Sequence, residues 1–241
     1  MERLSFIGDG LSHVAFGAMA VAGVLNFADS MALSLPVTIA CALVLLKSTR
    51  NAKTAGDAML AMLSVGAMAI GYLLMNLRPS TSNVSGDVCT TLFGSVSILT
   101  LTDKDLWLCA GLSLGVVVCW LHSYNRLFDV TFDECHAKAC GTNTALFNAV
   151  WAVVVAVVIV ISMRLVGTLL VTAILVFPAV TAMRVAKSFR AVTAVAAAFS
   201  VACSTVGILV AIVAGTPVGS TIVGVDIAAF LLVSTLGRLL K

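Results

Sequence analysis

Long apolar runs separated by short polar segments dominate this sequence. About eight runs approach the roughly 17 to 25 mainly apolar residues that one helix needs to cross a bilayer. Apolar residues make up 61% of the chain, charged residues only 10%, and the mean hydropathy is +1.12, which excludes a soluble globular domain. The sequence therefore predicts an all-α, polytopic membrane helix bundle. The predicted spans are 11–27, 31–46, 58–77, 106–121, 145–163, 165–185, 191–214 and 221–236.

Basic residues are distributed unevenly between the two sides of this bundle. If the amino terminus is inside, the outer segments hold only Arg78, Lys104 and Arg164 of the 14 basic residues. Cytoplasmic segments of membrane proteins carry an excess of Lys and Arg, so both termini and the segment 122–144 are predicted to be cytoplasmic. The long connection 78–105 is then outside. Its apolar part is too short to span and is predicted to lie at the membrane interface.

The most strongly charged interruption is DVTFDECHAKACG at 129–141. Long apolar runs flank it on both sides, so this segment must face water. Phe132, Cys135 and Ala139 recur at helical spacing, and Gly141 is a typical helix end. The pattern predicts a short amphipathic helix on the membrane surface, which could dock into another protein. An ordinary solvated connection is the alternative.

The sequence shows no recognisable catalytic machinery. It has no phosphate-binding GxxxxGK[ST] loop, no GxSxG elbow and no HExxH motif, and the three histidines are too scattered to nominate a base for an integral membrane enzyme. The seven cysteines lie mostly in apolar runs without a CxxC pair, so they are interpreted as small core residues. Small residues recur at 17–23, 66–71 and 194–199, as is typical of helices that pack closely in lipid.

Gly167, Thr172, Pro178 and Thr181 interrupt the sixth apolar run. A proline removes a backbone hydrogen bond, and in a membrane such irregular backbone is tolerated only where it is buried in protein or lines a polar cavity. The Ile174 carbonyl, freed by the proline, is expected to be satisfied by a nearby threonine.

Four stretches in order resemble one family, the membrane permease subunits of ABC importers, of the ABC-3 type, for zinc, manganese and related divalent metals. They are GDGLSH at 8–13, DVCTTLFGSVSILTLTDKDL at 87–106, DECHAKACG at 133–141 and RLVGTLLVTAILVFPAVTA at 164–182. The last is the longest and most specific, and the two later helices agree in length and polarity. Members usually carry one more spanning helix before the first stretch, whereas this chain begins at MERLSFIGDG.

The resemblance implies one permease domain over residues 1–241 with the type II ABC importer fold and a cytoplasmic coupling segment at about 124–144. It implies a transport subunit in a bacterial plasma membrane, with ATP hydrolysis by separate cytoplasmic ABC ATPase subunits. The other implied partners are an external metal-binding protein and a second permease copy, most simply in a homodimer. The transported ion would be zinc or manganese, with no permanently bound cofactor and no nucleic acid.

Asp9 and His13 are the candidate metal ligands. They stand at i and i+4, so on a helix their Cβ atoms lie about 6 Å apart on one face. A carboxylate and an imidazole suit both zinc and manganese. The alternative is that Asp9 only complements the first turn of a helix and His13 is interfacial. The resemblance further implies that Glu134, Ala137 and Gly141 contact the ATPase.

The resemblance also implies that Gly167 and Pro178 border the translocation path. Two other transporter classes remain open. A secondary, ion-coupled transporter commonly has a midplane carboxylate and internal repeats; Asp226 is the candidate carboxylate, but no repeat is evident. A permease for chelated iron or a corrinoid would carry an apolar cargo that does not call for an Asp and a His on one helix face.

Overall fold

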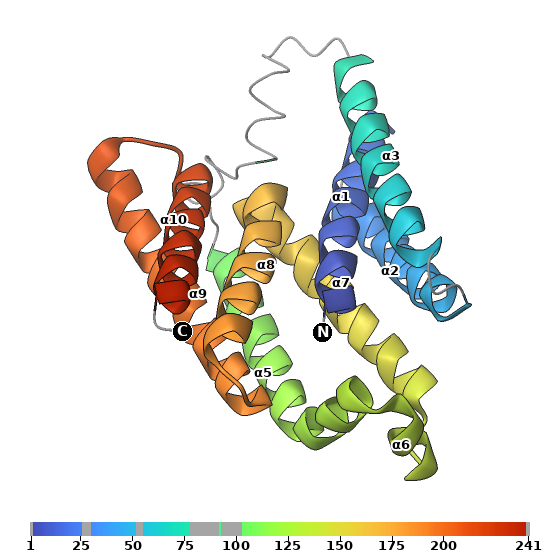
Figure 1. Ribbon diagram of the computed structural model, residues 1–241. Coiled ribbons are helices and arrows are strands. Elements are labelled where there is room, and N and C mark those ends of the chain that lie inside the picture. Colours follow the sequence, from blue (N-terminus) through green and yellow to red (C-terminus); the bar gives the residue numbers. More distant parts are fainter. Residues whose placement is uncertain (1, 26–29, 52–54, 78–91, 93–102, 240–241) are drawn as a thin grey trace. The chain divides into compact units, whose positions relative to one another are not determined.

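The computed structural model describes residues 2–25, 30–51, 55–77, 92 and 103–239, and it is helical without any strand in those residues. This part of the chain therefore has the all-α architecture that the sequence predicts (Figure 1). The helices are α1 (Glu2–Val24), α2 (Ser30–Asn51), α3 (Ala55–Leu77), α5 (Asp103–Phe132), α6 (Glu134–Ala139), α7 (Thr144–Val166), α8 (Thr168–Val185), α9 (Phe189–Ala214) and α10 (Val218–Leu239).

Within the described residues, six helices are long and apolar enough to cross a membrane: α3, α5, α7, α8, α9 and α10. The apolar part of α2 is shorter, Leu33–Lys47. The first half of α1 carries Glu2, Arg3 and Asp9, which interrupt its apolar character. The predicted count of about eight spans is therefore only roughly met.

Helix α5 is longer than the predicted span that ends at residue 121, because it continues without a break to Phe132. Its 30 residues correspond to about 45 Å of helix, whereas the apolar core of a bilayer is about 30 Å thick. Residues 122–132 contain neither Gly nor Pro, so nothing in the local sequence ends the helix there. About the last third of α5 therefore extends beyond a membrane-spanning length.

The chain forms two compact units, Met1–Thr81 with Thr100–Ile161, and Ser82–Leu99 with Ser162–Lys241. In the first unit, α1 packs against α2 and α3, and α6 packs against α5. In the second unit, α8, α9 and α10 pack against one another. That the whole chain acts as one permease domain stays a prediction.

Glycines bring α1 and α3 into close contact. A Cβ added at Gly17 would lie 2.8 Å from the Ala67 carbonyl oxygen, and one added at Gly71 would lie 2.9 Å from the Phe16 ring. Lipid supplies no hydrophobic force between helices, so this close approach provides the packing contacts. The close packing predicted for the stretches 17–23 and 66–71 is thus present at Gly17 and at Gly71.

In the second unit, α9 and α10 approach equally closely. A Cβ at Gly207 would lie 2.6 Å from the Ile222 side chain, so only glycine permits this spacing. Between α8 and α10, the Phe230 ring packs edge-on against Phe177 at a centroid distance of 6.1 Å and lies under the Arg184 guanidinium at 4.9 Å. These contacts fix the register of the three helices.

The connection 78–102, with its predicted interfacial segment and part of the second family-like stretch, lies outside the described residues except for Leu92.

Candidate functional site

Asp9 and His13 lie on one side of α1, as their spacing predicts. His13 Nε2 is 3.6 Å from Asp9 Oδ1, and the two side chains are 15% and 41% exposed, respectively. This separation is too long for a hydrogen bond. It is close to the distance of about 3.4 Å between an oxygen and a nitrogen bound to one tetrahedral ion at 2.0–2.2 Å.

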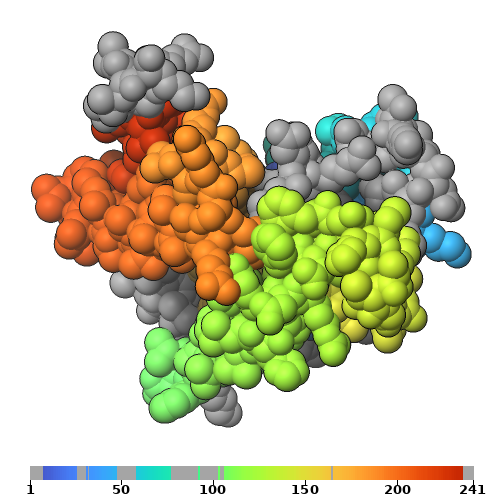
Figure 2. All heavy atoms as spheres, turned by 60° about the horizontal axis from the view of Figure 1, so that its bottom comes forward, coloured from blue at the N-terminus to red at the C-terminus, as the bar shows by residue number. Residues whose placement is uncertain are grey.

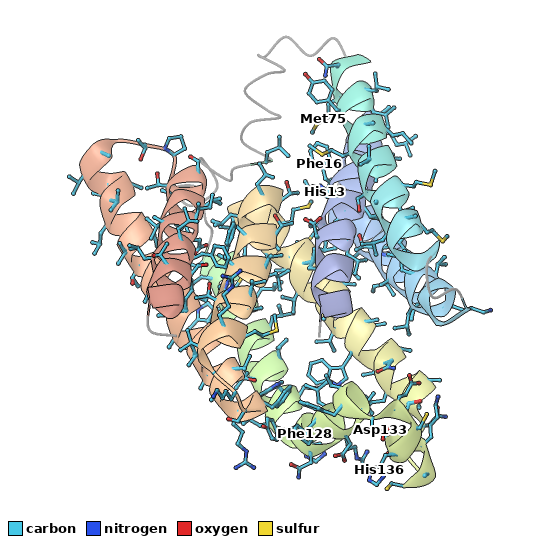
Figure 3. All side chains as sticks on the ribbon, in the orientation of Figure 1. His13, Phe16, Met75, Phe128, Asp133 and His136 are labelled. Carbon is cyan, nitrogen blue, oxygen red and sulfur yellow. The ribbon has the colours of Figure 1, made fainter. Side chains whose placement is uncertain are left out.

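His13 faces the side of α1 that packs on α3. Gly10 and Gly17 define that side, because Cβ atoms there would lie 3.0 Å from Ser64 Oγ and 2.8 Å from the Ala67 carbonyl oxygen. With 3.6 residues per turn, His13 projects within the same sector; Figure 3 shows it on α1, one turn from Phe16. Its Nδ1 is buried without a hydrogen-bond partner. The imidazole is therefore packed beside α3 with Nδ1 buried, and Nε2 is the ring nitrogen that faces Asp9.

The Asp9–His13 pair has only two ligand side chains. No group of three or more His, Cys, Asp or Glu side chains placed to hold a metal ion occurs among the described residues. A closed structural zinc site has four protein ligands. The arrangement suits an ion that binds transiently and takes its remaining ligands from water or from another chain.

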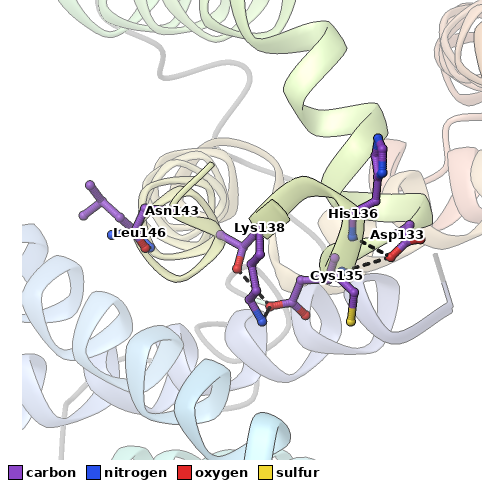
Figure 4. Close-up of polar contacts among 8 residues, drawn as sticks. Asp133, Cys135, His136, Lys138, Asn143 and Leu146 are labelled. Atoms are coloured by element: carbon purple, nitrogen blue, oxygen red, sulfur yellow. Dashed lines mark hydrogen bonds and ion pairs between the residues drawn. The ribbon is translucent and has the colours of Figure 1, made fainter. Parts of the chain in front are cut away.

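The charged segment between α5 and α7 forms the short helix α6, and Asp133 caps its amino end. Asp133 Oδ1 accepts hydrogen bonds from the backbone N–H groups of Cys135 and His136, both at 2.9 Å (Figure 4). The carboxylate thus satisfies two of the amides that a helix start leaves free. The predicted amphipathic helix is present, but Phe132 belongs to the end of α5 and not to this helix.

Gly141 ends α6, as predicted. Its φ of 82° lies in the left-handed region, which glycine adopts without a steric penalty. The Gly141 N–H donates to the Lys138 carbonyl, and the Thr142 N–H donates to the Ala137 carbonyl, each at 3.0 Å. This pair of bonds is a Schellman motif, and a Cβ at Gly141 would meet nothing within 4 Å. Glycine is therefore favoured here by the positive φ and not by a lack of room for a side chain.

Glu134 and Ala137 tie α6 to the rest of the chain. Glu134 Oε1 accepts a hydrogen bond from Thr144 Oγ1 at 3.0 Å, at the first residue of α7, and lies 2.9 Å from Lys138 Nζ. Ala137 is only 1% exposed. Thr144 is also buried at 1%, and nothing in the sequence pattern pointed to it, because the bond joins residues ten positions apart across a turn.

The opposite sides of α6 and the end of α5 are open to solvent. Cys135, His136, Ala139 and Cys140 are exposed, and Phe132 is 66% exposed. These segments lie at the surface in Figure 2, in green to yellow-green. The side defined by the apolar spacing of Phe132, Cys135 and Ala139 therefore faces outward. Ala137 faces the rest of this protein.

Gly167 separates α7 from α8. The sequence predicts a break near Arg164, but α7 continues to Val166 and the chain turns at this single glycine. Gly167 has φ 87° and ψ 158°, a region that essentially only glycine occupies. Its role in the structure is to end one helix and begin the next.

Pro178 lies buried inside α8, and Thr181 is the nearest threonine that bonds to the backbone there. Thr181 Oγ1 donates to the Phe177 carbonyl at 2.7 Å, not to the Ile174 carbonyl that the sequence pattern suggested. Thr172 Oγ1 donates to Leu169 at 2.9 Å. Neither threonine donates to the Ile174 carbonyl, so the expected compensation for the proline is not the one that these two bonds provide.

Asp226 is buried near the middle of the apolar span Val218–Thr235. It is 1% exposed, and both carboxyl oxygens lack a conventional hydrogen-bond partner. Cys203 of α9, itself 6% exposed, is the polar side chain that interacts with it. Two buried polar groups face one another here, across the same close α9–α10 contact that Gly207 permits.

Known proteins resemble this chain over nearly its whole length. The sequence pattern described as ABC 3 transport family matches residues 1–237. The chain is 25% identical over 234 residues to the manganese import system permease protein ScaB of Streptococcus gordonii, covering 96% of this chain and 81% of that protein. It is 26% identical over 233 residues to the manganese transport system membrane protein MntC of Halalkalibacterium halodurans, covering 96% and 77%.

A solved structure resembles the fold as well. It is titled PsaBC from Streptococcus pneumoniae in complex with Fab, and it superposes with a TM-score of 0.78 at 25% identity, covering 95% of this chain and 80% of that chain.

Proposed function

The chain belongs to the ABC 3 transport family, and from this premise we propose that it is the membrane permease subunit of an ATP-driven importer that carries manganese or zinc. The observation that supports this cargo is the Asp9–His13 pair. Its nitrogen and oxygen lie 3.6 Å apart on one helix, and ionisable groups inside a membrane protein commonly mark an ion pathway.

The ligand types limit the cargo to ions that accept both oxygen and nitrogen. Carboxylate and imidazole suit manganese and zinc, whereas copper(I) prefers thiolate and thioether ligands. Two protein ligands leave most of the coordination shell to water, so the ion can leave again. Asp9 and His13 are thus proposed as ligands on the transport path, not as a resident metal site.

The proposed partner at α6 is a cytoplasmic ATPase subunit. The resemblance implies that Glu134, Ala137 and Gly141 contact the ATPase. The geometry supports a different contribution from each of them. Glu134 and Ala137 fasten α6 to α7 and to the chain, and Gly141 sets the end of the helix, while Phe132 and Ala139 offer exposed apolar surface. A displacement of α6 by the ATPase would then be passed to α7 through the bond between Glu134 and Thr144.

The proposed assembly contains two permease copies, two ATPase subunits and an external metal-binding protein, in a bacterial plasma membrane with both termini of this chain in the cytoplasm. The resemblance and the excess of basic residues on one side support this arrangement. Gly167 and Pro178 are proposed to border the translocation path, because irregular helical backbone in a membrane belongs where it is buried or lines a cavity.

Reconstitution tests the proposal. The purified chain would be placed in proteoliposomes with its ATPase subunits, and manganese and zinc uptake would be measured with ATP, with a non-hydrolysable ATP analogue, and with an ion gradient alone. We expect uptake only with hydrolysable ATP and with the ATPase present. Uptake driven by an ion gradient without the ATPase would contradict the proposal and favour an ion-coupled transporter, with Asp226 as the coupling group.

A competition experiment separates the remaining alternative. Excess chelated iron or a corrinoid should leave manganese uptake unchanged, because the path offers ligands for a bare ion. Transport of the intact chelate, with no uptake of the free ions, would instead show an apolar path.

A further inference from the structure

Helix α6 and its C-cap residue Cys140 carry a second pair of metal-ligand side chains, which the proposed transport and coupling roles do not use. Cys140 Sγ lies 3.6 Å from His136 Nε2, within hydrogen-bond distance for sulfur. The two residues stand at i and i+4, and both side chains are exposed. A thiol and an imidazole therefore meet at the surface, away from the apolar spans.

The separation of these two atoms matches the geometry of one zinc ion. Zinc binds a thiolate at about 2.3 Å and an imidazole nitrogen at about 2.0–2.1 Å, and at a tetrahedral angle these bonds place sulfur and nitrogen about 3.5–3.6 Å apart. A zinc ion would replace the thiol proton, which is released as the thiolate binds, and the present separation suits both bonds to the ion.

Both ends of α6 are fixed, which keeps the pair in register. Asp133 caps the first turn, and His136 itself receives one of these cap bonds. At the other end the Cys140 N–H donates to the His136 carbonyl at 2.9 Å, and Gly141 closes the helix. The backbone of each ligand residue therefore takes part in a cap.

The other side chains of α6 point elsewhere. Successive residues on a helix are rotated by about 100°, so the sector of His136 and Cys140 lies roughly opposite Glu134 and Lys138. In Figure 4 the His136 imidazole and the Cys135 thiol project to opposite sides of the helix. Cys135 is thus an exposed cysteine on the same helix that is not placed to share an ion with His136.

Ligand chemistry selects the ion. Thiolate and imidazole favour zinc, whereas manganese prefers carboxylate, carbonyl and water. The pair supplies two of the four ligands of a tetrahedral site, and water can supply the rest. Binding would therefore be reversible, and it would respond to the zinc concentration on that side of the membrane.

We propose that His136 and Cys140 form a zinc site on α6, and that zinc bound there hinders coupling to the ATPase and so slows import. The inhibitory part rests on the proposed function, because it requires that α6 be the docking element and face the cytoplasm. The zinc site itself requires only the geometry of α6. A zinc ion held on the exposed surface of this six-residue helix would alter the surface that a partner must contact.

The site is tested without transport by cysteine labelling of the purified full-length permease. Maleimide modification of each cysteine would be followed by mass spectrometry, with zinc, with manganese or with neither. A zinc-bound thiolate is a poor nucleophile, so we expect zinc to slow labelling of Cys140 by about tenfold or more. Manganese should have no effect, and Cys135 is the matched control whose labelling should not change.

Variants identify the second ligand. In His136→Ala, zinc should no longer protect Cys140, whereas Cys135→Ser should leave the protection intact. Unchanged labelling of Cys140 with zinc in the parent, or equal protection in His136→Ala, would overturn the site.

The inhibitory effect is tested on ATP-driven manganese uptake, expressed for each variant as the ratio of the rates with and without zinc on the ATPase side. We expect zinc to lower this ratio in the parent and in Cys135→Ser, and to leave it near one in His136→Ala and Cys140→Ser. Equal inhibition of all four proteins would overturn the regulatory role. If uptake did not depend on ATP, the proposed function would fail while the labelling result would still decide the zinc site.

Discussion

Two pairs of side chains in this protein have the same spacing and separation but different chemistry. Asp9 and His13 on α1, and His136 and Cys140 on α6, each stand at i and i+4 with their polar atoms 3.6 Å apart. The first pair is held beside α3 with His13 only 15% exposed, and the second is open to solvent. Helical spacing therefore sets the distance, while ligand type and surroundings decide which ion can bind and from where.

The largest effect is expected from removing the α1 ligands. Asp9→Asn and His13→Ala should each lower manganese and zinc uptake by about 10- to 100-fold, since loss even of groups that support metal ligands costs this much. Uptake into proteoliposomes measures it, and copurification of the ATPase verifies assembly. Parent-level uptake of both metals in the double variant would show that Asp9 and His13 do not bind the transported ion.

The second prediction tests how the α1 pair is held. Gly17→Ala places a methyl group 2.8 Å from a backbone oxygen of α3, and such overpacking should cost about 1–3 kcal/mol of stability. The control is Gly23→Ala, where a Cβ would meet nothing within 4 Å. Thermal unfolding in detergent measures both; equal melting temperatures for the two variants would mean that α1 and α3 do not pack so closely.

Replacing the carboxylate of the α1 pair by a thiol should give that pair the preference for zinc that is proposed for the α6 pair. Asp9→Cys gives α1 the sulfur and nitrogen ligands that α6 has, so the preference for zinc over manganese in uptake should rise by about tenfold. Asp9→Asn is the control for loss of the carboxylate alone. An unchanged ratio between the two metals would show that the residue at this position does not contact the transported ion.

The next prediction concerns the caps that hold the α6 pair. Gly141→Leu forces a branched side chain into the left-handed region and should cost about 1–2 kcal/mol, enough to loosen α6 and reduce ATP-driven uptake. Gly141→Asn should retain most of the activity, because asparagine tolerates this conformation. ATP-driven uptake and ATPase pull-down distinguish them, and parent-like behaviour of the leucine variant would exclude a coupling role for this helix end.

The smallest stability change is expected at Pro178. Pro178→Ala should alter the stability by about 1 kcal/mol or less, because recovery of the backbone hydrogen bond that proline removes offsets the loss of the buried ring, but it should change the uptake rate if α8 borders the path. Uptake and thermal stability would be compared in the same preparation. Unchanged uptake with a large fall in melting temperature would assign the proline a purely structural role.

Local sequence predicted well those features that depend on neighbours within one turn. The end of α6 at Gly141 and the shared side of Asp9 and His13 were both predicted, because each depends on contacts at most four or five residues apart. The sequence did not show how far α5 continues: the predicted span ends at residue 121 where polar residues begin, but polar residues without Gly or Pro remain helical. The break near Arg164 was likewise misplaced by three residues, since a charge does not end a helix and the conformation of Gly167 does.

The sequence by itself determined that this is a helical membrane protein, which charged segment interrupts it and where the ligand side chains pair along a helix. Only the tertiary structure decided that Gly17 and Gly71 pack closely while Gly23 and Gly66 face open space, and that Ala137 is buried while His136 and Cys140 stay exposed. The physical reason is the distance along the sequence between the residues that interact. Caps and i, i+4 pairs are fixed by the residues of a single helical turn, whereas burial depends on a second helix some 50 positions away along the chain, as Gly17 and Ala67 show.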